Sequence, residues 1–200
     1  MRQTNSDIEN ALIEGCKKGK PKAQEGLYKH FYGYAMGICL RYANSKDEAS
    51  EILNDSFLKV FEKIDQYDQS KLFKAWLRRI LINTSIDYYR RNNKHYNHLE
   101  LEKARREEHD YDVVNQLNAE DILKVMQQLP DNYRLTFNLY EVEGYTHEEI
   151  SELMQIPVGT SKSNLSRAKQ KLRALVQDLF GVKNAAKEAS EQRWKLSGFL

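Results

Sequence analysis

The sequence is poor in cysteine, proline and glycine, and each shortage excludes a class of protein. The two cysteines, Cys16 and Cys39, stand alone with no CxxC pair, which excludes a disulfide scaffold or a zinc ribbon and suits a reducing compartment. Three prolines and nine glycines in 200 residues are too few for a loop-rich β-sandwich or a low-complexity chain.

Long apolar runs are also missing. Only 40% of the residues are apolar and 30% are charged, and the longest uncharged stretch of the first half, residues 31–40, has ten residues. A helix that crosses a bilayer needs roughly 20 apolar residues. The first ten residues carry charges and amides where a secretory signal has an apolar core. We therefore expect a cytoplasmic protein without membrane insertion.

The net charge of the chain is small, but its positive charge is concentrated in two places. The net charge is only +2, yet residues 71–94 carry a net +6 and residues 160–173 a net +5. Residues 96–121 between them carry a net −5, and residues 141–152 hold five acids and no lysine or arginine. This distribution favours a protein that grips a polyanion at two points.

Apolar residues recur at helical spacing almost throughout the chain, and no useful stretch alternates with period two. We therefore predict an all-α fold, with a bundle of three or four helices in residues 1–95 and a short helix leading into it. Three apolar stripes define this bundle: Leu27, Phe31, Tyr34, Ile38 and Tyr42; Ala49, Leu53, Phe57, Val60 and Ile64; and Leu77, Leu81, Thr84 and Tyr88.

Residues 96–118 lose this periodicity and gain charge, which predicts an acidic linker before a second domain, residues 119–180. In that domain, Asp131 is a candidate helix cap, and Thr146 with Glu149 spells a capping box before a short helix. After a break, Thr160 is expected to cap a long basic helix. Short helix, tight turn and basic helix together predict a helix-turn-helix. Residues 181–200 either dock on the body or on a partner, or form a loosely ordered tail.

The long basic helix carries a polar face opposite its predicted core stripe. Hydrogen-bonding side chains of this kind read base edges in the major groove. The alternative is a solvated cationic face, but the preceding turn and capped helix favour DNA. The candidate DNA-binding residues on this face are Lys162, Ser163, Ser166, Arg167 and Gln170.

A second unusual face lies on the helix predicted over residues 72–91. Opposite its core stripe, aromatic, basic and amide residues share one side: Trp76, Arg79, Asn83, Asp87 and Arg90, with Phe73 beside them. Exposed aromatics cost solubility unless a ligand stacks on them, and unpaired bases are the natural ligand among arginines. The alternative is that Phe73 and Trp76 pack inside the bundle.

No catalytic constellation is visible in the sequence. His147 begins a segment that lacks the second histidine of the zinc-binding motif HExxH. The histidines His95, His98 and His109 lie in or beside a polar linker, where no surrounding side chains would orient them to bind a metal. No nucleophile is paired with a base. We therefore expect no enzyme, no cofactor and no metal, and a small hydrolase is the least favoured function.

The motifs in this order resemble the bacterial RNA polymerase sigma factors of the two-domain extracytoplasmic-function group, over roughly residues 20 to 178. Residues 47–61 look like the family's clamp-binding helix, and residues 73–91 look like its promoter-melting helix. Ser161 and Asn164 depart from the residue types that many members carry. The C-terminal motifs that carry the resemblance are Leu129-Pro130, Arg134, Glu143-Gly144, Glu149-Ile150, residues 159–163, Leu165, Arg167-Ala168 and Leu172.

The resemblance implies a role for each group of residues. The polymerase clamp would be faced by four acids of the clamp-binding helix: Asp47, Glu48, Glu51 and Asp55. The downstream promoter element would be opened and held by Phe73, Trp76, Arg79, Asn83, Arg90 and Arg91, and the upstream element would be read as duplex by the polar face of the long basic helix.

Partners follow from the same resemblance: the clamp and flap regions of the polymerase core, promoter DNA, and an anti-sigma factor. The acidic linker would thread toward the polymerase's RNA exit path, and the protein itself would catalyse nothing. The alternative from another class is a free-standing helix-turn-helix repressor or activator, which would bind duplex DNA tightly by itself.

Overall fold

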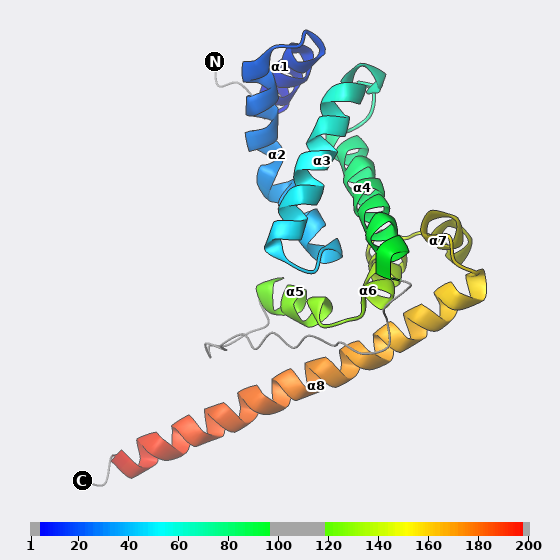
Figure 1. The fold of residues 1–200 in the computed structure, drawn as a ribbon. Coiled ribbons are helices and arrows are strands. Elements are labelled where there is room, and N and C mark those ends of the chain that lie inside the picture. The colour runs from blue at the N-terminus through cyan, green and yellow to red at the C-terminus, as the bar shows by residue number, and fades with distance from the viewer. Residues whose placement is uncertain (1–4, 97–118, 198–200) are drawn as a thin grey trace. The chain divides into compact units, whose positions relative to one another are not determined.

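The structure, a computed structural model, describes the backbone of residues 5–96 and 119–197 and the side chains of residues 7–92 and 122–177. Every regular element in these ranges is helical (Figure 1), which confirms the all-α prediction. The chain divides into two compact units, residues 1–95 and 96–200. Apart from its first residue, the predicted linker 96–118 lies outside the described residues. None of the described helices is both long and apolar enough to cross a membrane.

The first unit contains four α-helices, as the apolar stripes predict. Its core is formed by those stripes, with Leu27, Leu53, Leu77 and Leu81 fully buried and Tyr34 at the half-exposed edge. The helices are α1 (Asn5–Lys17), α2 (Pro21–Tyr42), α3 (Lys46–Lys63) and α4 (Phe73–Tyr96), with a short 3-10 turn, η1 (Ile64–Gln66), after α3.

Close approach of α1 and α2 depends on two glycines. A Cβ atom at Gly15 would lie 2.4 Å from the Cβ of Ala23, and one at Gly26 would lie 2.6 Å from a methyl group of Leu12. Pro21 opens α2, where its missing N–H costs no hydrogen bond. Helix α1 is thereby packed closely against the start of α2.

The start of α4 is held by an aromatic cluster. The ring of Phe73 lies 5.0 Å from that of Phe31 on α2 and 5.2 Å from that of Tyr67. The Tyr67 hydroxyl donates to the Lys71 carbonyl, and Asp68 accepts from the backbone N–H of Ser70 over 2.9 Å. The connection between α3 and α4 is therefore held by hydrogen bonds and ring packing, and these contacts set the direction of α4.

The second unit contains α5 (Ala119–Gln127), α6 (Asp131–Phe137), a π-helical turn η2 (Asn138–Val142), α7 (His147–Met154) and α8 (Val158–Ser197). Its described core is formed by Leu135, Leu139, Ile150, Met154 and Ala168. Helix α8 continues through residues 181–197, so the segment predicted as a possible loose tail is helical over this range.

One of the three predicted caps in this unit is confirmed. The Thr146 hydroxyl accepts from the N–H of Glu149, and the Glu149 carboxylate accepts from the N–H of Thr146, which completes the capping box. The other two predictions are wrong. Helix α6 has Pro130 at its N-cap, which leaves the Asp131 carboxylate to pair with Arg134, and α8 already begins at Val158, so Thr160 lies inside the helix.

The glycine contact between α1 and α2 predicts opposite effects for two alanine substitutions. Gly15→Ala should destabilise the first unit by about 1–3 kcal/mol, because neither Cβ can move away without shifting a helix. Gly33→Ala, where a Cβ meets nothing within 4 Å, should stabilise it by about 0.5–1 kcal/mol. Urea unfolding followed by Trp76 fluorescence in a Trp194→Phe background measures both, and equal stabilities would contradict the contact.

Candidate nucleic-acid interface

The polar face predicted on the long basic helix is exposed on α8. All five candidate residues, Lys162, Ser163, Ser166, Arg167 and Gln170, are exposed, while Leu165 and Ala168 on the opposite side are buried. Among the described residues, the Arg167 guanidinium makes one hydrogen bond, a 3.4 Å contact to the Tyr133 hydroxyl, which leaves most of its donors available. The face can therefore offer several donors and acceptors to a duplex groove.

The turn between α7 and α8 presents this face. Gln155 ends α7 in the left-handed conformation with φ 56°, and the Ser151 hydroxyl donates to the Ile156 carbonyl over 2.6 Å. Because these contacts close the turn within a few residues, α7 and α8 follow one another as the helix-turn-helix prediction requires.

Two residues of α8, Ser161 and Asn164, are buried, so they do not belong to its exposed face. The Ser161 hydroxyl lies 2.9 Å from Nδ1 of His147 on α7, and the His147 ring stacks on Tyr140 at 4.5 Å. The sequence analysis missed this contact between the two helices. The spacing of the sequence could have predicted that Ser161 is buried, because it lies one helical turn before Leu165 and two before Ala168, on the core side of the helix.

The face predicted on α4 is divided between surface and core. Arg79, Asn83 and Asp87 are exposed, and Trp76 is half-buried. Phe73 is only 4% exposed, which corrects the prediction that it lies beside the exposed face. The physical reason is the aromatic cluster, in which Tyr67 and Phe31 enclose the Phe73 ring. The alternative reading, packing inside the bundle, holds for Phe73.

Trp76 occupies the boundary between this cluster and the surface. Its ring lies 5.6 Å from that of Phe73 and 5.4 Å from that of Tyr67. A half-buried indole that packs on two rings in this way is held in place, and its exposed part is accessible to a ligand.

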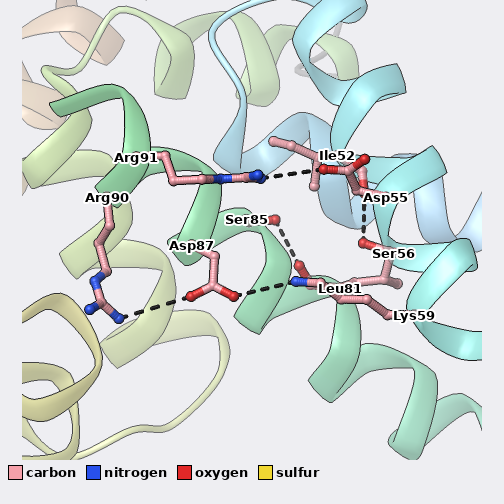
Figure 2. A network of polar contacts seen from close by, with 9 residues as sticks. All are labelled: Ile52, Asp55, Ser56, Lys59, Leu81, Ser85, Asp87, Arg90 and Arg91. Carbon is pink, nitrogen blue, oxygen red and sulfur yellow. Dashed lines mark hydrogen bonds and ion pairs between the residues drawn. The ribbon is translucent and has the colours of Figure 1, made fainter. Parts of the chain in front are cut away.

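Acids and bases alternate along the seam between α3 and α4, as Figure 2 shows. Asp87 lies 3.3 Å from Lys59 and 3.9 Å from Arg90, and Asp55 lies 3.3 Å from Arg91. These five residues line a hollow of about 310 Å³. The candidate bases Arg90 and Arg91 are thus each paired with a carboxylate, and Lys59 is a base of this region that the sequence analysis left out.

The four candidate polymerase-facing acids lie on α3 and differ in what they contact. Glu48 accepts from the backbone N–H of Asn44 over 2.5 Å, and Glu51 accepts from the Tyr88 hydroxyl over 2.9 Å. Burial and the hydrogen bond to Glu51 raise the pKa of Tyr88, so the phenol remains a donor at neutral pH. The Asp47 carboxylate forms no hydrogen bond or ion pair with another described residue.

Nothing in the described part of the chain resembles a metal site, since no three histidine, cysteine or acidic side chains gather there. Both cysteines are buried, and burial raises the pKa of the Cys16 thiol to about 11 and that of the Cys39 thiol to about 12. Thiols held protonated in this way are poor nucleophiles and poor metal ligands at neutral pH.

Two family models match the two units separately. Residues 27–95 match sigma-70 region 2, and residues 119–172 match sigma-70 region 4. A helical bundle with a basic aromatic helix, followed by a helix-turn-helix unit, is therefore the two-part plan of a sigma factor. The chain belongs to the sigma-70 family.

Curated relatives define the group within this family. The chain is 25% identical over 185 residues to the ECF RNA polymerase sigma-E factor of Haemophilus influenzae, covering 86% of this chain and 96% of that protein. It is 29% identical over 182 residues to the ECF RNA polymerase sigma factor SigW of Bacillus subtilis, covering 84% and 96%. The protein is an extracytoplasmic-function sigma factor, and thus a transcription initiation factor. The free-standing repressor is excluded.

Two solved structures are similar over most of the chain. CnrH in complex with the cytosolic domain of CnrY matches with a TM-score of 0.44 and 20% identity, over 86% of this chain and 99% of that one. The sigma factor RpoE of Bartonella quintana, in complex with the anti-sigma factor NepR, matches with a TM-score of 0.47 and 22% identity, over 75% and 94%.

One side of α4 is buried and the other is exposed, so truncating a side chain on each side should lower the free energy of unfolding by different amounts. Phe73→Ala should destabilise the first unit by about 3–5 kcal/mol, because it empties the centre of the aromatic cluster. Arg79→Ala, on the exposed side, should change its stability by no more than about 0.5 kcal/mol. Thermal unfolding followed by circular dichroism compares the two, and similar midpoints would place Phe73 on the surface.

Proposed function

We propose that the two units divide promoter recognition between single-stranded and duplex DNA. The observation that carries this proposal is the presence of one exposed DNA-compatible face on each unit, each fixed by the burial of the opposite side of its helix. The two faces differ in chemistry, because the face on α4 includes an aromatic ring and the face on α8 does not.

The α4 face would open and hold the downstream promoter element. Trp76 would stack on an unpaired base, Arg79 and Asn83 would contact the extruded strand, and Arg90 and Arg91 would hold its backbone. The half-buried position of Trp76 supports this role, since an indole anchored on Phe73 and Tyr67 is already ordered before a base reaches it. Phe73 would act from the core, as the support of Trp76.

The α8 face would read the upstream element as duplex. Arg167 and Lys162 carry the charge that attracts DNA, and Ser163, Ser166 and Gln170 add hydrogen-bonding groups suited to base edges. The exposure of all five residues supports this role.

The acids Asp47, Glu48, Glu51 and Asp55 on α3 would contact a basic surface of the polymerase clamp, and the second unit would meet the flap region. In this role the protein works in the cytoplasm, supplies specificity to an enzyme and catalyses nothing itself. An anti-sigma factor would regulate it, as the resemblance to extracytoplasmic-function sigma factors implies.

Dependence on the polymerase core is the first test of this function. In a gel-shift with a promoter fragment, the full chain with core polymerase should form a specific complex, and the chain alone should form little or none. Core polymerase without the chain is the control. Strong specific duplex binding by the chain alone would contradict the proposal.

The two DNA contacts should separate on a promoter with a pre-melted bubble. Trp76→Leu keeps an apolar side chain over Phe73 and Tyr67 but removes the stacking ring, so it should impair strand opening, and the bubble should restore much of its activity. Arg167→Ala should lose about 1–3 kcal/mol of promoter affinity on both templates if the arginine makes a bidentate base contact. Permanganate footprinting of unpaired thymines measures opening. If Trp76→Leu opens the promoter strands as well as the parent chain does, Trp76 does not contact the unpaired DNA.

A further inference from the structure

The seam between α3 and α4 joins residues that the proposed function assigns to different partners. Glu51 and Asp55 belong to the polymerase-facing acids of α3, and Arg91 belongs to the DNA-facing bases of α4. The Tyr88 hydroxyl donates to Glu51 over 2.9 Å, and the Arg91 guanidinium lies 3.3 Å from the Asp55 carboxylate. The same guanidinium lies 6.0 Å from the centre of the Tyr88 ring. These four residues are called the α3–α4 ladder below.

Each ladder contact occupies a group that is needed elsewhere. A carboxylate that accepts from Tyr88 or Arg91 is partly neutralised toward a basic clamp, and Arg91 beside Asp55 is partly neutralised toward a phosphate. The side chains of Asp55 and Arg91 are 44% and 63% exposed, so a large partner can reach either of them. An exposed ion pair shifts an equilibrium by no more than about fivefold, so a partner of opposite charge can displace it.

Resting on the proposed function, we propose that the ladder couples polymerase binding to DNA binding. When the clamp takes Glu51 and Asp55, Tyr88 and Arg91 are released to promoter DNA. Tyr88 is thereby a further DNA-contacting residue, with a ring that can stack and a hydroxyl that can donate to a phosphate. Linkage makes the effect reciprocal: DNA that engages Arg91 frees Asp55, and each partner raises the affinity for the other by the same factor.

The chain supplies its own control for this coupling. Asp47 lies on the same helix and belongs to the same acidic group, is exposed, and has no polar contact with any described residue of α4. Asp47→Asn therefore removes the same charge from the polymerase-facing acids as Asp55→Asn does, without breaking a ladder contact.

The test measures the coupling factor directly. The labelled full chain is titrated with core polymerase, with and without a saturating single-stranded oligonucleotide selected by the holoenzyme from a random pool. The oligonucleotide should raise the affinity of the parent chain for the core about fivefold. Asp55→Asn and Arg91→Gln should each lower this factor to about twofold, the part that Tyr88 and Glu51 still carry, and the double variant should do no more, because both changes remove one contact. Tyr88→Phe, which keeps the ring, should lower the factor partway. Asp47→Asn should weaken core binding and keep the factor.

A second measurement needs no polymerase. The free Asp55→Asn chain should bind the oligonucleotide about fivefold more tightly than the parent, and Asp47→Asn should change this affinity less than twofold. Equal effects of the two variants would overturn the ladder, as would a factor of one in the parent or a factor that stays undiminished in both Asp55→Asn and Arg91→Gln. A parent chain that binds no core polymerase at all would instead overturn the proposed function on which the ladder rests.

Discussion

Burial of one side of α4 is the interaction on which the first unit depends. Leu77 and Leu81 are fully buried and Phe73 nearly so, and burying side chains of this size contributes about 1.5–3 kcal/mol each. A rigid helix of 3.6 residues per turn then leaves no freedom in where the other side points. The packing of the core therefore determines that Arg79 and Asn83 project into solvent, and no separate interaction is needed to place them.

The second unit uses the same principle with one polar element. Leu165 and Ala168 bury one side of α8, and Ser161 adds a hydrogen bond to His147 where an apolar contact would otherwise lie. A hydrogen bond constrains distance and direction more narrowly than an apolar contact does. The angle between α7 and α8, on which any duplex contact depends, is thus set by a pair of directional groups inside the unit.

Electrostatics adds a constraint that packing alone does not impose. Arg91 of α4, a base that suits DNA, lies directly against Asp55 of α3, an acid that suits a basic protein surface, so the two surfaces share a boundary. The reverse pair, Lys59 of α3 with Asp87 of α4, lines the same hollow. Exposed pairs of this kind contribute little to stability. Their effect is on the availability of each charge, and a factor that must bind an enzyme and DNA at the same time is sensitive to that availability.

Local features of this protein were determined by the sequence itself. The apolar stripes predict α2, α3 and α4, the exposed face of α8 follows from the same periodicity, and the Thr146 capping box forms within four residues, because all of these depend on neighbours along one helix. Contacts between helices were decided only by the tertiary structure. Phe73 is buried because Phe31 and Tyr67 happen to enclose it, and Asp131 turns to Arg134 because Pro130 already occupies the cap. The ladder exists because two helices bring acids and bases within about 3 Å. One-dimensional spacing shows which side of a helix a residue occupies, but a residue at the boundary of a face is assigned to core, surface or ion pair by the side chains that other helices place beside it.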